Sequence, residues 1–128
     1  MRYVLLLGRI LYSAIFILAG LGHFSRAAIH YAESMGLLMA DLLVPLAGII
    51  AILGGVSILL GYKAKAGAWL IVIFLIPVSL TMHGFWMFDD PMQIEMQKAM
   101  FFKNMSMLGA ALMIAYFGSG SLSIERRT

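Results

Sequence analysis

The stretch LLVPLAGIIAILGGVSILLGYKAKAGAWLIVIFLIPVSLTMHG, residues 42–84, decides the fold. It contains two apolar runs, 42–61 and 66–84, which are separated by a short connection that carries Lys63 and Lys65. A membrane-spanning helix needs roughly 20 mostly apolar residues, and both runs reach that length. Because lipid offers no hydrogen-bond partners, a spanning segment must satisfy its backbone polar groups internally, as a helix does. The stretch therefore predicts two antiparallel transmembrane helices joined by a tight turn.

Two further apolar runs, 3–22 and 99–117, lie on either side of this hairpin. The whole chain is 62% hydrophobic and 12% charged, whereas a soluble domain averages about 45–50% apolar and about 25% charged residues. The first run resembles a signal peptide only superficially, because it is as long as a full span and three more spans follow. We therefore expect a single membrane domain over residues 1–128, an all-α bundle of four antiparallel transmembrane helices that includes the first run.

The basic residues give the expected orientation of this bundle in the membrane. With both termini in the cytoplasm, the basic residues divide unevenly between the two sides of the membrane. The inner side receives Arg2, Lys63, Lys65, Arg126 and Arg127, and the outer loops receive Arg26 and Lys98. Cytoplasmic loops carry an excess of Lys and Arg, so this asymmetry predicts that both termini lie on the cytoplasmic side.

The two outer connections are longer and carry signals of local structure. Ser25 can cap a short helix that Gly36 ends, which places a helix in the first outer loop. In the second, Asp90 is a candidate N-cap and Pro91 a first helical residue, so the last helix should begin about two turns before the membrane. Pro45 is expected to start the second spanning helix in the same way. The stretch GSGSLSIERRT from residue 118 has the composition of a loose tail.

Packing in lipid depends on close backbone approach and on hydrogen bonds between helices. The second span offers a stripe of small residues: Ala47, Ala51 and Gly55. Pro77 lies inside the third span, where it removes a backbone hydrogen bond and predicts a kink. Ser79 and Thr81 are candidates to satisfy the backbone groups that Pro77 frees.

Several classes of function are excluded or unsupported by the composition. The chain has no cysteine, which removes disulfide, thiolate and iron–sulfur chemistry. Its net charge of +3 comes from scattered basic residues, so nucleic acid is not an expected partner. The sequence contains no nucleophile–base pair, phosphate loop or zinc motif. Any redox role must therefore use a bound cofactor or a partner protein.

The polar residues within the spans are the candidate site residues, because charges in membrane segments are costly. On the first span, Arg9 and His23 fall on one helix face. Arg9 lies near the inner end and either extends to the interface or partners a ligand or carbonyls inside the bundle. Near the outer side, His23, His83 and Lys103 end or border three different spans, and Trp86 lies beyond the third.

These outer residues have two interpretations. In the first, His23, His83 and Lys103 converge on a pocket where they donate hydrogen bonds to the carbonyl oxygens of a quinone, and aromatic residues such as Trp86 hold its ring. In the second, each is an ordinary interfacial residue. Haem held by the two histidines and Cu(I) held by the methionines Met92, Met96 and Met100 are less well supported alternatives.

Several motifs together resemble the DoxX family of membrane proteins over nearly the whole chain. They are GRILYSAIFILAGLGHF in the first span, AILGG and LLGYKA around the second, the late histidine His83, and KN at Lys103–Asn104. The resemblance implies a four-helix protein of the bacterial cytoplasmic membrane, with named members in quinone-linked or other membrane oxidoreductase complexes. Its matching candidate residues are Arg9, His23, His83, Lys103 and Asn104. Many members carry an acidic residue where this chain has Ala51.

The leading functional hypothesis is an accessory subunit of a quinone-linked redox system, with a ligand or partner site at the outer end of the bundle. Its expected partners are the lipid bilayer and a membrane or periplasmic redox protein. The alternative is a structural or assembly protein without chemistry, in which the small-residue stripe of the second span builds a homo-oligomer or a complex. A small-molecule transporter ranks last, since four spans are few and no inverted repeat is present.

Overall fold

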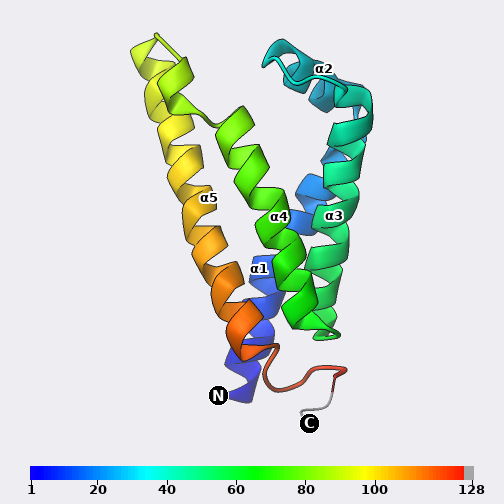
Figure 1. Ribbon diagram of the computed structural model, residues 1–128. Coiled ribbons are helices and arrows are strands. Elements are labelled where there is room, and N and C mark those ends of the chain that lie inside the picture. The colour runs from blue at the N-terminus through cyan, green and yellow to red at the C-terminus, as the bar shows by residue number, and fades with distance from the viewer. Residues whose placement is uncertain (126–128) are drawn as a thin grey trace.

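The computed structural model describes residues 1–125, which form helices joined by short loops (Figure 1). In chain order these are α1 (Arg2–Gly22), α2 (Arg26–Ser34), α3 (Ala40–Leu60), α4 (Ala64–Met82), the 3-10 helix η1 (Phe85–Met87) and α5 (Pro91–Phe117). Four of them, α1, α3, α4 and α5, are long and apolar enough to cross a membrane. The predicted all-α fold with four spans is therefore confirmed.

The long helices alternate in direction, so that the start of α1 and the end of α5 lie at the same end of the bundle (Figure 1). This is the arrangement that two termini on one side of a membrane require. The assignment of that end to the cytoplasm stays a prediction from the basic residues. Below, "tail end" denotes the end that carries the N-terminus and residues 118–125, and "loop end" denotes the opposite end with α2 and η1.

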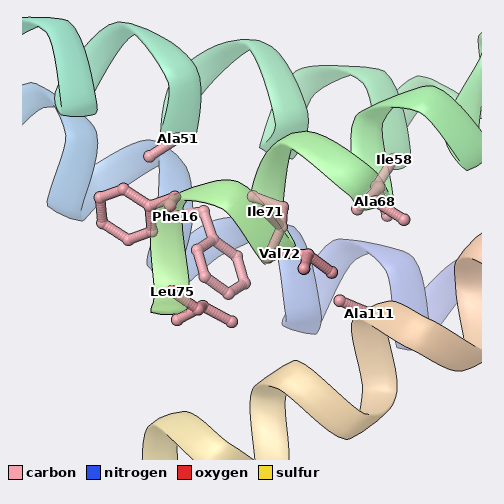
Figure 2. Packing of buried hydrophobic residues seen from close by; sticks show 9 residues of the cluster. Phe16, Ala51, Ile58, Ala68, Ile71, Val72, Leu75 and Ala111 are labelled. Carbon is pink, nitrogen blue, oxygen red and sulfur yellow. The ribbon is translucent and has the colours of Figure 1, made fainter. Parts of the chain in front are cut away.

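The helices pack in the order α1, α3, α4, α5, with α2 lying against α3 at the loop end. At that end, α4 and α5 diverge from α2 and α3 (Figure 1). The largest buried cluster is apolar and draws on all four spanning helices (Figure 2). Its members are Phe16, Ala51, Ile58, Ala68, Ile71, Val72, Phe74, Leu75 and Ala111.

Glycines let α3 approach its two neighbours closely. A Cβ built on Gly48 would lie 2.7 Å from the carbonyl oxygen of Gly20 on α1. A Cβ on Gly54 would lie 2.9 Å from the carbonyl oxygen of Gly67 on α4. Because lipid supplies no hydrophobic drive between helices, such backbone contacts are a main source of packing energy. The small residues of α3 therefore hold the bundle together within one chain.

The connection before α3 has the structure that its capping signals predict. Ser25 is the N-cap of α2, and its hydroxyl accepts a hydrogen bond of 3.1 Å from the Ala28 amide. The helix ends in a left-handed Gly36 (φ 89°), and the next amide, of Leu37, donates back to the Ala32 carbonyl. This is the hydrogen-bond pattern of a Schellman motif, for which glycine is the favoured residue.

The start of α5 is fixed by Asp90, as the sequence predicts. The Asp90 carboxylate accepts a hydrogen bond of 3.3 Å from the Gln93 amide, and Pro91 is the first helical residue. Removing such a cap typically costs about 1 kcal/mol. We therefore expect Asp90→Ala to lower the free energy of unfolding by about 1 kcal/mol, measured by SDS titration in mixed micelles. Asp89→Ala, an equal change at the exposed neighbour, should leave it nearly unchanged. Equal losses in both variants would contradict the role of Asp90 as the cap.

Two expectations about prolines and hydroxyls are wrong. The helix α3 begins at Ala40 rather than at Pro45, because Met39 adopts a left-handed conformation and turns the chain one full turn earlier. Buried Ala40 then packs beneath α2. In α4, neither predicted hydroxyl bonds the Ile73 carbonyl that Pro77 leaves free. Thr81 donates a hydrogen bond of 2.7 Å to the Pro77 carbonyl, and the fully buried Ser79 hydroxyl has no partner among the described residues.

The predicted loose tail is also wrong for residues 118–125, which fold back across the tail end of the bundle. The Ile124 and Glu125 amides donate hydrogen bonds of 3.0 Å to the carbonyls of Leu60 and Gly61. The Glu125 carboxylate accepts a hydrogen bond of 2.9 Å from the Lys63 amide, directly before α4. A negative charge is favourable at a helix N-terminus, which explains why this segment is held there.

Candidate ligand cavity

A cavity of about 430 Å³ lies at the loop end of the bundle. The end of α1, the helix α2, the first half of α3 and the second half of α4 form its wall. Its wall is almost entirely apolar, with Phe74 and Ala47 among the lining residues. The two predicted histidines, His23 and His83, both line it. The structure thus brings together two of the candidate site residues, from α1 and from the end of α4.

His23 is held in place by its own helix and by two neighbours. Its Nδ1 lies 2.6 Å from the carbonyl oxygen of Ala19, one turn earlier. Its ring packs edge-on against Phe74 at a centroid distance of 5.5 Å. A Cβ on Gly48 would lie 2.7 Å from the His23 Cβ, so the close approach of α1 and α3 also fixes this residue.

His83 is the C-cap of α4, and a side chain of α5 orients its ring. Its Nδ1 lies 2.8 Å from Oε1 of Gln97, a residue with only 7% of its surface exposed. The sequence alone does not reveal this pairing. The signal that points to it is the spacing of Gln97, Asn104 and Ala111, the buried residues of α5, which recur every seven residues.

The middle of the cavity wall is the part of α4 around its proline. Ile73, Pro77 and Thr81 line the cavity at successive turns of one helix face. Pro77 has no amide proton to donate to the carbonyl of Ile73, so that carbonyl lacks its helical partner. The proline thus introduces backbone polarity into an otherwise apolar wall.

Three other predicted residues of the loop-end half do not line the cavity. Lys103 is exposed, and Asn104 is buried on the inward face of α5. Trp86 is half exposed and stacks edge-to-face with Phe85 and Phe101, at 5.2 and 5.6 Å between ring centroids. The expectation that Lys103 and Trp86 join the histidines around one pocket is therefore wrong. α5 contributes to the site only through Gln97, which orients His83.

Arg9 lies at the opposite, tail end of the bundle and is only 5% exposed. Its guanidinium donates a hydrogen bond to the carbonyl of Leu122, in the segment that folds back over this end. Arg9 therefore partners a protein carbonyl, one of the alternatives left open by the sequence, and it does not contact the cavity. Among residues 1–125, its Nε and Nη1 have no hydrogen-bond partner.

No group of three or more metal-binding side chains gathers within the described part of the chain. Ala51 is fully buried in the apolar cluster. Among the described residues, the cavity presents two imidazoles, the hydroxyls of Thr81 and Tyr31 and aromatic carbon, without a carboxylate in its wall. Such a site suits an apolar ring with a small number of hydrogen-bonding groups.

Comparisons with known proteins identify the family. A family model described as DoxX matches residues 4–84. Inner membrane protein YphA of Escherichia coli is 29% identical over 127 residues, covering 97% of this chain and 89% of that protein. Inner membrane protein YqjF of the same organism is 30% identical over 123 residues, covering 94% and 88%.

A more distant relative is ER-derived vesicles protein ERV29 of Saccharomyces cerevisiae, 24% identical over 79 residues. That match covers 62% of this chain, which spans only about a quarter of the yeast protein (25%). No solved structure gives a significant match. With the family model over most of the chain and two bacterial relatives over nearly its full length, the chain belongs to the DoxX family and is a multi-pass protein of the inner membrane.

Proposed function

We propose that the protein is an accessory component of a quinone-linked membrane redox system and that it holds the ring of a hydrophobic ligand in the cavity between His23 and His83. The observation that carries the proposal is this cavity of about 430 Å³, with its apolar wall and two imidazoles. Small-molecule sites are typically clefts of about 300–1,000 Å³ lined by apolar side chains with a few polar groups. A redox protein of the membrane or periplasm is the proposed partner.

The position of the cavity supports entry of a ligand from the lipid. Three lining residues, Leu43, Leu46 and Ile73, are also exposed on the apolar outer surface of α3 and α4, at 39%, 46% and 56%. In a membrane, such a surface contacts acyl chains rather than water. A lipid-soluble ring compound with an apolar tail can therefore reach the cavity sideways, with its tail left in the bilayer.

The alternative of a purely structural protein has lost its main support. It depended on the small-residue stripe of α3 as a surface for assembly. Within the chain, Ala51 of that stripe is fully buried, Gly55 packs against Ile17 of α1, and Ala47 lines the cavity. A homo-oligomer would need to use another surface, and the proposal for the cavity does not depend on one.

Filling the cavity tests the proposal without removing a polar group. Ala47 lines the cavity, so Ala47→Phe should place a ring where the ligand ring belongs. We expect this variant to weaken binding of an alkyl-benzoquinone or its hydroquinone at least tenfold, measured by equilibrium binding to the protein in lipid nanodiscs.

The matched control is Leu53→Phe, a change to the same residue at an exposed position of the same helix, away from the cavity. It should bind as the original protein does. Failure of the unaltered protein to bind any ring compound would refute the proposal, and equal binding by both variants would place the ligand elsewhere.

A further inference from the structure

The hydrogen bonds of the two imidazoles determine which ring nitrogen carries the proton. At His23, Nδ1 faces the backbone carbonyl of Ala19 at 2.6 Å, and a carbonyl oxygen can only accept. Nδ1 must therefore be the protonated nitrogen. In a neutral ring, Nε2 then has a lone pair and no proton. Within residues 1–125 the hydrogen bond of the His23 ring is made by Nδ1, which leaves Nε2 available to accept from a ligand.

His83 also carries its proton on Nδ1, but its hydrogen-bond partner is different. Its Nδ1 faces Oε1 of Gln97 at 2.8 Å, and in this orientation of the Gln97 amide the oxygen accepts and Nδ1 carries the proton. Nε2 of His83 is thus a second free acceptor at the cavity. Two histidines from two helices are held in one tautomer by two unrelated oxygen atoms.

Apart from the Tyr31 hydroxyl, the other polar groups on this wall accept as well. The Thr81 hydroxyl gives its proton to the Pro77 carbonyl at 2.7 Å, which leaves its lone pairs for a ligand. The Ile73 carbonyl has no helical donor because residue 77 is a proline. Tyr31, at the exposed border of the cavity, is the lining residue whose hydroxyl proton makes no hydrogen bond within the described residues.

We propose that the cavity selects a ligand that donates hydrogen bonds, so that it binds the hydroquinone form of a ring compound in preference to the quinone form. This inference rests on the proposed function, since it names the redox state of the ligand in the same cavity. A quinone offers two carbonyl acceptors, which would face acceptors here. A hydroquinone offers two hydroxyl donors, which complement Nε2 of His23 and Nε2 of His83. When two acceptors face each other in the cavity, neither makes a hydrogen bond. This loss disfavours binding of the quinone.

The tautomers can be tested before any ligand is added. The protein is labelled with ¹⁵N-histidine and studied in nanodiscs at pH 8.5, where imidazoles are neutral. The expected result is a one-bond coupling between nitrogen and hydrogen at Nδ1, and none at Nε2, for both His23 and His83. A proton on Nε2 of either ring would overturn the inference.

Selectivity is then measured with three probes that share one alkyl tail: a benzoquinone, its hydroquinone, and the 1,4-dimethoxybenzene that has no donor. Binding is measured anaerobically in nanodiscs. We expect the hydroquinone to bind at least about tenfold more tightly than either of the others, the loss that one to two missing hydrogen bonds produce. Equal or reversed affinities would overturn the selectivity and leave the proposed function standing. No binding of any probe would overturn both.

A pair of variants assigns the selectivity to the imidazoles. Gln97→Met removes the acceptor that orients His83, which should reduce the hydroquinone preference several-fold while binding of the dimethoxy probe stays unchanged. Tyr12→Phe is the matched control, because it removes a different hydrogen bond to α5, of 2.6 Å to the Met107 carbonyl, away from the cavity. It should keep the preference. A preference that depends on Tyr31→Phe and not on Gln97→Met would contradict the role of the imidazoles.

Discussion

Gly48→Ala is expected to lower the free energy of unfolding by about 2–3 kcal/mol, although it adds only one methyl group to a helix. The added Cβ would lie 2.7 Å from both the Gly20 carbonyl oxygen and the His23 Cβ. The carbonyl is backbone and cannot rotate away, so α1 and α3 would have to separate. Overpacking of this kind typically costs about 1–3 kcal/mol, and here the added methyl group would meet the backbone of a neighbouring spanning helix.

The same substitution at Gly109 of α5 should instead raise the free energy of unfolding. A Cβ there meets no atom within 4 Å, and alanine is the better helix former by roughly 0.5–1 kcal/mol. Both variants can be unfolded by SDS titration in mixed micelles and compared with the original protein. Equal effects of the two substitutions would mean that α1 and α3 do not meet at Gly48. Since Gly48 also abuts His23, Gly48→Ala should weaken ligand binding as well.

The spanning helices were predictable because their signal is local. Lipid forces every backbone group in a span to bond within its own segment, so length and apolarity alone identify α1, α3, α4 and α5. Capping is equally local, and Ser25 and Asp90 therefore predicted where α2 and α5 begin. The predicted start of α3 at Pro45 was wrong because the true start depends on packing. Ala40 is buried beneath α2, and no local signal in the sequence reveals that contact.

The candidate site was only partly predictable, because sequence gives depth in the membrane more reliably than rotation about a helix. His23 and His83 lie at matching depth and do reach one cavity. Lys103 has a similar depth, but the inward face of α5 passes through Gln97, Asn104 and Ala111. Lys103 directly precedes Asn104, and successive residues of a helix are rotated by about 100°. Lys103 therefore lies off the inward face and is exposed. The pairing of His83 with Gln97 depends on this rotation and could not be read from composition.

The tail end shows the same limit for long-range contacts. The composition of residues 118–125 is that of a flexible segment, yet the segment is hydrogen-bonded to the turn between α3 and α4. A second partner that holds it there, besides the start of α4, is Arg9, more than a hundred residues earlier in the chain. A buried guanidinium needs acceptors, and carbonyls of an irregular segment can supply them where helical carbonyls cannot.

Arg9→Met should therefore release the tail while the helices stay folded. The substitution keeps an unbranched apolar side chain but removes the hydrogen bond to the Leu122 carbonyl. A buried hydrogen bond to a charged group contributes about 1.5–3 kcal/mol, so the opening of this segment should become about ten- to a hundredfold more frequent. Hydrogen exchange measures this directly, because the Ile124 and Glu125 amides are bonded to the carbonyls of Leu60 and Gly61 and should exchange faster by that factor.

Arg2→Met is the matched control, since it removes the same charge from the same helix at an exposed position where the guanidinium donates a hydrogen bond to the neighbouring Tyr3. Exchange at Ile124 and Glu125 should be unchanged in this variant. Unchanged exchange in Arg9→Met as well would mean that Glu125 and the backbone bonds hold the tail without Arg9. Faster exchange throughout α1 and α3 would instead make Arg9 a determinant of the whole bundle, because loss of a tail contact alone leaves the amides of the spanning helices protected.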